Sequence, residues 1–442
     1  MSRFSSLNRR TFLKTSAGAG MAAMALPALA APESANEKLN IAVVGPGGRG
    51  YGNLKGVAGE NIVALCDVDA RRASKAFEEF PQAKRYVDFR KMLSDLDKQI
   101  DAVVVSTPDH THAPPAVMAM KMGKHCYCEK PLAHEVYEVR VMRDIAKKNN
   151  LATQMGTQIH AGDNYRRVVE LVQAGAIGPV DEVHVWSAAK YGNVERPTET
   201  PPVPEGLDWD LWLGPAPYRP YHPCYVPFAW RHWLDFGSGG LGDFGCHYGD
   251  LPFWALDLRY PTTVKTVGPP QHPEATPIGL VVDYTYPARG KMPPVKLTWY
   301  DGGKQPPLLK QISDKYDQGK EKKGRLMWGS GVLFVGSGGM LLADYSRHVL
   351  LPEEKFADYK RPEPTIPSSI GHHKEWIQAC KTGEPTTCNF DYSGALSEAV
   401  LLGMVSYRVG QELQWDAKQL KATNCPEADR FIRRTYREGW TL

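Results

Sequence analysis

The first part of the chain alternates short apolar runs with longer segments of helical periodicity. The runs are rich in Val, Ile and Ala, which is typical of strands buried in a parallel sheet, whereas the intervening segments space their apolar residues as amphipathic helices do. This order predicts a doubly wound α/β domain with helices on both faces of the sheet. We expect strands at residues 39–45, 61–66, 102–106, 125–128 and 151–155, and helices at 70–80, 89–96, 115–122 and 135–149.

The pattern changes after residue 156. A helix is expected at 163–174, followed by strand-like runs at 180–188, 279–287, 294–300, 331–336 and 339–345. Few helical segments separate these late runs, which indicates a mostly antiparallel open sheet in an α+β domain. We therefore divide the chain into residues 39–156 and residues 157–442, with helix-like segments at 371–381 and 391–411 packing back on the core.

The N-terminus has the features of an export signal. Residues 8–14 read Asn-Arg-Arg-Thr-Phe-Leu-Lys, an Ala- and Gly-rich apolar stretch follows, and Ala28-Leu29-Ala30 offers a small-residue cleavage site. A buried helix or a membrane anchor is the alternative, but the stretch is short and Gly-rich for either. We expect a twin-arginine signal peptide at 1–30, a linker at 31–38, and a protein that is periplasmic or otherwise exported.

Composition and charge narrow the functional class. Hydrophobic residues are 42% and charged residues 23% of the 442 residues, which excludes a disordered chain. The formal charge is +4, but residues 1–30 hold four basic residues and no acid, so the remainder is formally neutral. This balance predicts neither nucleic-acid binding nor attachment to a membrane once the signal is removed. The eight cysteines contain no Cys-x-x-Cys pair, and we expect free, buried thiols.

A glycine-rich motif follows the first predicted strand. It reads Gly45-Pro46-Gly47-Gly48-Arg49-Gly50, a G-x-G-x-x-G pattern. The first glycine permits a tight turn, the second lets a pyrophosphate approach the backbone, and the third allows close packing of the next helix on the sheet. Together with its position, this motif predicts a Rossmann dinucleotide-binding domain.

The next strand ends at Asp67, which favours NAD. A carboxylate there accepts hydrogen bonds from the ribose hydroxyls and repels a 2′-phosphate. Arg71 and Arg72 lie just beyond and could instead bind that phosphate, so NADP stays open as the alternative cofactor.

Three further motifs stand where strands and helices of such a protein should begin or end. They are Ser106-Thr107-Pro108-Asp109-His110-Thr111-His112, Cys128-Glu129-Lys130-Pro131-Leu132 and Gly240-Leu241-Gly242-Asp243-Phe244-Gly245-Cys246-His247-Tyr248. With the glycine loop they resemble the Gfo/Idh/MocA oxidoreductases, the glucose–fructose oxidoreductase and inositol dehydrogenase family, over nearly all of residues 39–442. Residues 209–217 and 299–303 resemble an exported bacterial branch of that family.

The resemblance implies roles for individual residues. Lys130 would sit beside the nicotinamide, hold the reacting hydroxyl and share its proton. Asp243 and His247, spaced i and i+4 on one helix face, would face the substrate, with His247 as the general acid or base and Asp243 orienting it or binding a hydroxyl. We expect the nicotinamide side to be lined by Ser106, Thr107, Pro108, His110, His112, Glu129 and Gln158.

Two alternatives remain for the Asp243 and His247 pair. The pair could lie on a helix surface, or could bind a metal with Asp250 completing the same face. We expect no metal, because the family reaction needs none. Trp230 and Arg231 combine an aromatic face with hydrogen-bond donors, which suits a sugar ring.

These features predict an NAD(P)-dependent oxidoreductase that moves a hydride between a sugar, glycoside or cyclic polyol and the cofactor. Free NADH is scarce outside the cytoplasm, so we expect the cofactor to be tightly held. The alternatives are an NAD-assisted glycosidase or lyase, which oxidises a sugar transiently to allow elimination, and a noncatalytic sugar- or cofactor-binding protein. By analogy with the family, the free face of the second sheet is expected to form a homo-oligomer.

Overall fold

A computed structural model describes residues 37–317 and 324–442. The predicted signal peptide, residues 1–30, and most of the predicted linker, residues 31–38, lie outside the described residues. Residues 39–442 form one unit that contains both sheets.

Six parallel strands form the first sheet, in the order β3-β2-β1-β4-β5-β6. This is the doubly wound order predicted from the sequence. The edge strand β3 was not predicted, because its three residues are polar or half-buried and show no apolar run. The strands are β1 (Asn40–Val44), β2 (Asn61–Cys66), β3 (Lys84–Tyr86), β4 (Ala102–Val105), β5 (His125–Cys128) and β6 (Thr153–Met155).

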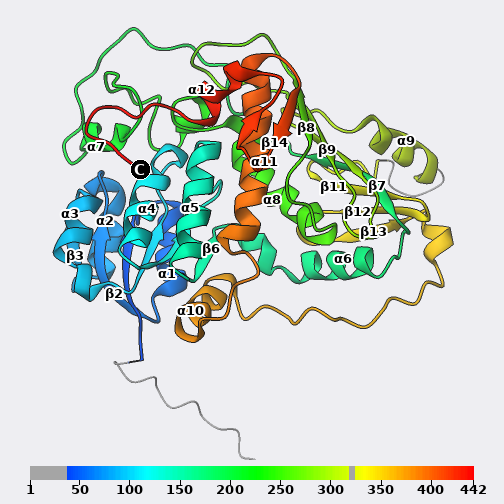
Figure 1. Cartoon of the computed structure of the whole chain (residues 1–442), viewed down its shortest axis with the longest axis horizontal. Helices are drawn as coiled ribbons and strands as arrows, with labels where there is room; N and C mark the ends of the chain where they lie inside the picture. The colour runs from blue at the N-terminus through cyan, green and yellow to red at the C-terminus, as the bar shows by residue number, and fades with distance from the viewer. Residues whose placement is uncertain (1–36, 318–323) are drawn as a thin grey trace, which may run out of the picture. The chain divides into compact units, whose positions relative to one another are not determined.

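Helices cover both faces of this sheet, as Figure 1 shows. Successive side chains of a strand point to opposite faces, so the sheet contributes to two separate apolar clusters. Asp69 and Asp88 cap two of the helices by accepting hydrogen bonds from backbone amides of the first turn. The helices are α1 (Arg49–Val57), α2 (Ala70–Glu79), α3 (Phe89–Asp95), α4 (Ala113–Lys121) and α5 (Val136–Lys148).

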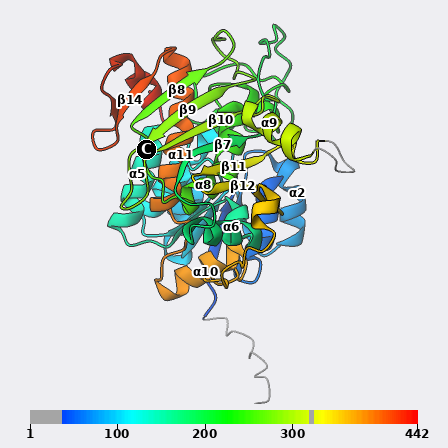
Figure 2. The same ribbon diagram turned by 90° about the vertical axis from the view of Figure 1, so that its right-hand side faces the viewer.

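Nine strands form the second sheet, in the order β13-β12-β11-β7-β10-β9-β8-β14-β15. Only β7 and β10 pair in parallel, and every other pair is antiparallel, so the predicted mostly antiparallel sheet is confirmed. Figure 2 shows its outer face. The strands are β7 (Val180–Trp186), β8 (Thr263–Val267), β9 (Val281–Tyr286), β10 (Val295–Tyr300), β11 (Gly331–Gly336), β12 (Gly339–Ala343), β13 (His348–Leu351), β14 (Leu413–Asp416) and β15 (Lys421–Ala422).

The inner face of the second sheet is covered by helices that also contact the first domain. Helices α8 (Gly239–Ala255) and α11 (Phe390–Val409) lie between the two sheets (Figure 1), and α11 packs on both α5 and α8. The outer face is covered in part by α9 (Pro307–Tyr316), which buries Leu309 and Ile312. The rest of that face carries polar side chains such as Glu182 and Lys296.

Helix α10 (His372–Thr382) joins the C-terminal part of the chain to the first domain. Trp376 is fully buried in the core cluster that contains Leu54 and Tyr127, and the ring of His373 stacks on Tyr127 with centroids 5.0 Å apart. In the structure this segment packs on the core of the first domain. The remaining helical segments are α6 (Asp163–Gln173), α7 (Trp209–Leu213), α12 (Asp429–Ile432) and six short 3-10 turns at 97–99, 109–111, 158–161, 229–232, 353–356 and 426–428.

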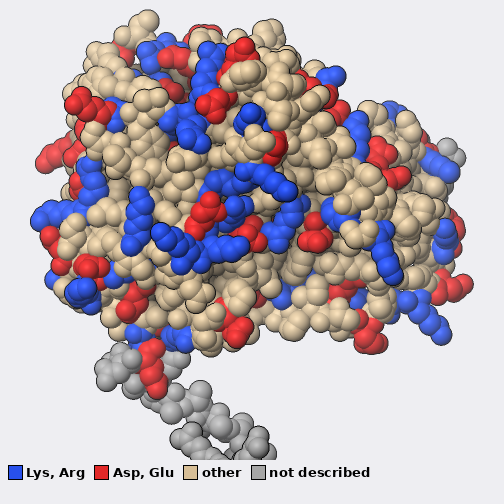
Figure 3. Space-filling model, in the orientation of Figure 1, with Lys and Arg blue, Asp and Glu red and all other residues tan. Residues whose placement is uncertain are grey.

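The surface carries mixed charges (Figure 3) and the cysteines are free thiols. Within the described ranges, no helix is both long and apolar enough to cross a bilayer. On the face in Figure 3, acidic and basic side chains are interspersed. All eight cysteines are described and none forms a disulfide; six are buried as predicted, whereas Cys224 and Cys380 are half-buried.

Candidate active site

A cavity of about 720 Å³ opens at the carboxyl ends of the parallel strands. Its walls come from the loops after β1, β2, β4 and β5, from the irregular segment 211–231, and from α8. Ligands of doubly wound folds bind at this edge of the sheet. Most of the predicted site residues line this one cavity, although they come from segments more than 200 residues apart.

The glycine loop forms the floor at the start of α1. Gly45 and Gly48 have φ values of +76° and +55°, which side chains rarely adopt. A Cβ on Gly50 would lie 1.8 Å from the carbonyl oxygen of Gly45, so this glycine is required by the turn. No side chain caps α1 in the described structure. The amides of Gly50 and Tyr51 donate to the carbonyls of Gly47 and Gly48 within the turn, which leaves those of Gly48 and Arg49 for a phosphate. The loop therefore fits a dinucleotide.

Asp67 lies at the end of β2 and lines the same cavity. Burial raises the pKa of its carboxyl to about 6, and its Oδ1 accepts a hydrogen bond from the backbone amide of Asp69. Arg71 is paired with Asp69 at 2.7 Å, whereas Arg72 reaches over Gly48 into the cavity. Of the two arginines considered for an NADP phosphate, Arg72 lines the main cavity, and Arg71 lines an adjoining pocket that also includes Gly48 and Arg72.

The loop after β4 supplies the next wall. Ser106, Thr107, Pro108 and His112 all line the cavity, and the hydroxyl of Thr107 is buried with no hydrogen-bond partner in the structure. The ring nitrogens of His112 lie 2.8 Å from the carbonyl oxygens of Pro131 and Thr107, which fixes this loop to the segment after β5.

His110 departs from its predicted place at the cofactor. It is fully buried, its Nε2 lies 2.9 Å from the carbonyl oxygen of Trp212, and its ring packs against Trp212 and Phe236. Burial lowers its pKa well below the usual value. Because the loop turns through a 3-10 helix at this point, the His110 side chain faces the aromatic core while Asp109 and His112 face the cavity.

Glu129 is the centre of a polar network in the wall of the cavity, which Glu129, Arg49 and Gln158 all line. Its Oε1 accepts hydrogen bonds from Asn53 and Gln158, both at 2.8 Å, and from Arg49 at 3.3 Å. Burial alone would raise its pKa, but the charge of Arg49 and these bonds lower it. Gln158 also donates to the hydroxyl of Tyr127 at 2.7 Å. The network ties the glycine loop, β5 and the domain junction together at the cavity wall.

Lys130 and Asp243 form the central ion pair. The Lys130 Nζ donates to Asp243 Oδ1 at 2.6 Å and to the Asp243 carbonyl oxygen at 2.8 Å. The Arg231 Nε lies 3.0 Å from the same carboxyl oxygen. Burial opposes ionisation of Asp243, but the charges of Lys130 and Arg231 hold its pKa well below the usual range. Asp243 therefore contacts Lys130 and Arg231, and it does not orient His247 as one alternative had proposed.

His247 lies one turn further along α8 and also lines the cavity. Burial, aided by the positive charge of Lys130, lowers its pKa to about 3, so the imidazole is neutral near neutral pH. Its Nδ1 is buried with no hydrogen-bond partner in the structure. Lys130, Asp243 and His247 all line this one cavity.

Trp230 and Arg231 form an aromatic wall at the mouth. The Arg231 guanidinium lies between the rings of Phe228 and Trp230, at 4.3 and 4.1 Å from their centroids. Phe228 is 52% exposed, whereas Trp230 is buried. This wall presents an aromatic face beside cationic donors.

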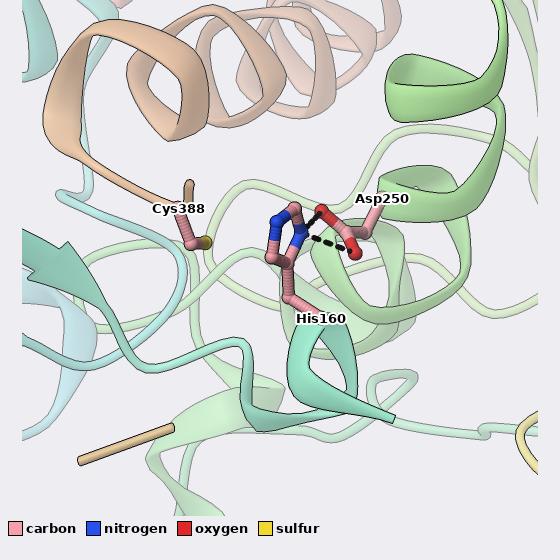
Figure 4. Close-up of side chains that lie close together, drawn as sticks. All are labelled: His160, Asp250 and Cys388. Carbon is pink, nitrogen blue, oxygen red and sulfur yellow. Dashed lines mark hydrogen bonds and ion pairs between the residues drawn. The ribbon is translucent and has the colours of Figure 1, made fainter. Parts of the chain in front are cut away.

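Asp250 belongs to a different cluster, with His160 and Cys388 (Figure 4). The His160 Nδ1 lies 2.9 and 3.0 Å from the two Asp250 oxygens, and the His160 ring stacks on Trp254. Tyr392 donates to the same carboxylate at 2.8 Å. Asp243, His247 and Asp250 therefore do not converge on one metal position. The His160 cluster instead packs α8 against its neighbours below the cavity.

Several residues at the site were not predicted, and three of them show what signal the sequence offered. Asp109 stood inside a quoted motif but was given no role, Asn53 follows the glycine motif on α1, and Trp440 lies at the end of the chain. The position of Asp109 within its motif was a usable signal. Trp440 carried none, because only folding brings residue 440 against Phe89 and Arg90 at the cavity wall.

The fold and the cavity define a dinucleotide-binding protein of the Rossmann class. Comparison with known families goes further. Residues 39–157 match a model described as "Oxidoreductase family, NAD-binding Rossmann fold", and residues 165–292 match its partner, "Oxidoreductase family, C-terminal alpha/beta domain". The chain belongs to this family, the Gfo/Idh/MocA oxidoreductases, and its Rossmann domain is of the NAD-binding type. Residues 6–27 match the twin-arginine translocation signal sequence.

Individual relatives are more distant. Inositol 2-dehydrogenase of Salmonella typhimurium is 30% identical over 152 residues, 33% of this chain and 45% of that protein. A glycosyl hydrolase family 109 protein of Shewanella pealeana is 29% identical over 201 residues, 39% of this chain and 44% of that protein. The chain thus spans less than half the length of these curated relatives.

A solved structure matches over a longer part of the chain. The WlbA dehydrogenase of Bordetella pertussis, solved with NADH and UDP-GlcNAcA, has a TM-score of 0.59 and 15% identity, covering 86% of this chain and 99% of that one. At this identity the match supports the fold alone.

Proposed function

We propose that the protein is an NAD-dependent oxidoreductase that transfers a hydride between a hydroxyl of a sugar, glycoside or cyclic polyol and a tightly held nicotinamide. The observation that carries the proposal is the shared cavity. An ammonium paired with Asp243 and a neutral imidazole face the same space as the glycine loop. The family membership and the similarity to an inositol dehydrogenase support the choice of substrate class.

In this proposal the cofactor is held by the glycine loop and by Asp67, with Thr107 and Pro108 beside the nicotinamide. When bound, the nicotinamide accepts or donates the hydride. Lys130 donates a hydrogen bond to the oxygen of the reacting hydroxyl, and its charge stabilises the alkoxide that develops there. His247 is neutral and accepts the hydroxyl proton. Asp243 holds the Lys130 side chain in position through the two hydrogen bonds that Lys130 donates to it.

The segment 206–214, which we name the strap, lines the cavity through Leu211 and Trp212 and supports retention of the cofactor. The segment before α7 is pinned to the β2 loop, because the amide of Asp208 donates to Val68 at 2.8 Å and the amide of Ala70 donates to Gly206 at 2.8 Å. At the other end, Arg437 pairs with Asp210 and brings Trp440 to the cavity wall. We expect NAD to leave only when this strap opens.

The signal sequence and the sheet suggest where and how the protein works. A twin-arginine signal sends folded proteins out of the cytoplasm, and we propose that this one acts in the periplasm with its cofactor already bound. We further propose that it forms homo-oligomers through the polar part of the outer sheet face. A monomeric mass in light scattering would contradict the second statement.

A second function is favoured by one comparison. The similarity to a glycosyl hydrolase family 109 protein supports an NAD-assisted glycosidase or lyase, in which the same Lys130 and His247 would serve a transient oxidation. Incubation with aryl glycosides separates the two. Release of the phenol without accumulation of NADH favours the glycosidase, and NADH formation without phenol favours the dehydrogenase.

The direct experiment uses the protein as purified. Mass spectrometry of the nucleotide that co-purifies should identify NAD, and its redox state should change when a reacting sugar or polyol is added. A protein that carries no nucleotide, and whose added NAD is not reduced by any sugar, glycoside or polyol in a broad panel, would contradict the proposal.

A further inference from the structure

We propose that Asp109 is a substrate-binding residue whose carboxyl group binds a second hydroxyl of the substrate, next to the one that is oxidised. This inference rests on the proposed function for the identity of the substrate class. The Asp109 carboxyl has no role in the proposed hydride transfer, in which Lys130 and His247 act on the reacting hydroxyl.

The position of Asp109 is the first argument. It opens the 3-10 turn after β4 and lines the cavity, although only 3% of the residue is exposed. The Asp109 Oδ2 lies close to α8, because a Cβ added to Gly242 of that helix would be 4.0 Å from this oxygen. Gly242 directly precedes Asp243, so the Asp109 carboxyl lies beside the central ion pair.

The Asp109 carboxyl makes no hydrogen bond or ion pair within the described part of the chain. The nearby Asp243, by contrast, is bonded to Lys130 and close to Arg231. The carboxyl oxygens are open to the cavity rather than sealed in the core, so the bonds that they lack within the protein can be supplied by a ligand there. The cavity is the space from which a partner could come.

The electrostatic setting determines what that partner is. Burial raises the pKa of Asp109, against the charges of His112, Lys130 and Arg231, and Asp243 adds a like charge. Cationic side chains already lie near Asp109, so its carboxyl does not require a cationic ligand. An anionic ligand group would be repelled by the carboxyls of Asp109 and Asp243. A neutral hydroxyl, which both donates and accepts hydrogen bonds, suits this carboxyl in either protonation state. Vicinal hydroxyls of a sugar or cyclic polyol place such a group next to the reacting one.

A purely structural role is the competing explanation. An aspartate at the start of a turn often caps it through its side chain. Here the Asp109 backbone carbonyl accepts the bond from His112, and its side chain makes none. Asparagine keeps the shape of the side chain and its capacity to hydrogen-bond in a turn. Because the Asp109 side chain makes no capping bond, we expect Asp109→Asn to leave the fold unchanged.

The test compares Asp109→Asn and Asp109→Ala with the wild type, all as the NAD-loaded protein. The matched control is Asp181→Asn, an exposed carboxylate on β7 away from the cavity. The probes are D-glucose, myo-inositol and methyl β-D-glucopyranoside, with monodeoxy analogues of whichever probe reacts fastest. We expect Asp109→Ala to lower kcat/KM about 10- to 100-fold, the size of a lost hydrogen bond to a substrate hydroxyl. The affinity for NAD should not change.

The deoxy analogues distinguish binding from structure. For one analogue, the one that lacks the contacted hydroxyl, wild type and Asp109→Ala should react equally fast. An unchanged kcat/KM in both variants, or an equal loss with every analogue, would overturn the inference while leaving the proposed function intact.

Direct binding covers the case in which no probe is oxidised. Calorimetry with the same probes on wild type and Asp109→Ala then decides, because failure of turnover bears on the proposed function only. Loss of binding in the variant supports the role of Asp109. Equal binding by both proteins, or no binding by the wild type, refutes it.

Discussion

Replacement of Lys130 by methionine is the perturbation that bears most directly on the proposed chemistry. The variant keeps the length of the side chain but removes the Nζ that donates to Asp243 at 2.6 and 2.8 Å. Asp243 retains Arg231 at 3.0 Å, so its buried charge is not left alone. We therefore expect a modest loss of stability, about 1.5–3 kcal/mol, the range for a hydrogen bond to a charged group.

The effect on turnover should be much larger. A group that handles the proton in the transition state contributes about 10²- to 10⁴-fold, or about 3–5 kcal/mol of barrier. NAD binding depends on the glycine loop and Asp67, which do not contact Lys130, and its affinity should stay within a few-fold. The exposed Lys265→Met on β8 is the matched control.

The assay follows reduced nicotinamide by absorbance after a single addition of sugar, with the cofactor load measured by mass spectrometry. Retained turnover in Lys130→Met with a full cofactor load would refute the role of this residue. Loss of cofactor together with activity would show that Lys130 acts in assembly of the site instead.

Three further outcomes are expected. Gly50→Ala should reduce NAD affinity by at least about tenfold in calorimetry, because its Cβ would meet the Gly45 carbonyl at 1.8 Å; unchanged affinity would show that the turn adapts. His247 has a folded pKa of about 3 against 6.5 unfolded, so only the unfolded state takes up its proton between these values. The free energy of unfolding should fall as the pH drops below about 6.5, more steeply in wild type than in His247→Asn by up to about 1.4 kcal/mol per pH unit; equal slopes in urea denaturation would contradict the burial of a neutral imidazole. Trp440→Ala should speed NAD release in a dilution assay, and an unchanged rate would exclude a role of the strap in retention.

The fold could be predicted from the sequence wherever local pattern and tertiary environment agree. β2 and β5 were predicted residue for residue, since β2 is an apolar run and β5 lies between two well-marked helices. β3 and β15 have three and two residues and are defined only by their pairing partners, so no local pattern identifies them. Helix α9 was missed because it packs on the outer face of a sheet expected to be free.

The candidate site divides in the same way. Lys130, Asp243 and His247 were found because each stands in a motif, and Arg231 because aromatic residues flank it in the sequence. Which contacts they make was not predictable. The pairing of Asp243 with Lys130 depends on α8 meeting the end of β5, 113 residues away in the sequence. His110 was wrongly predicted to line the cofactor site. It lies in a 3-10 turn, and only the folded turn determines which of the side chains at 109–112 face the cavity.

Transfer of deuterium is the most direct test of the central claim. The protein, with the cofactor it carries, is incubated with a sugar or polyol deuterated at each carbinol carbon, and the nicotinamide is then examined by mass spectrometry. The account predicts that one deuterium from carbon appears on the nicotinamide ring, and that Lys130→Met slows its appearance. A nicotinamide that stays unlabelled while the sugar is consumed would contradict hydride transfer in this cavity.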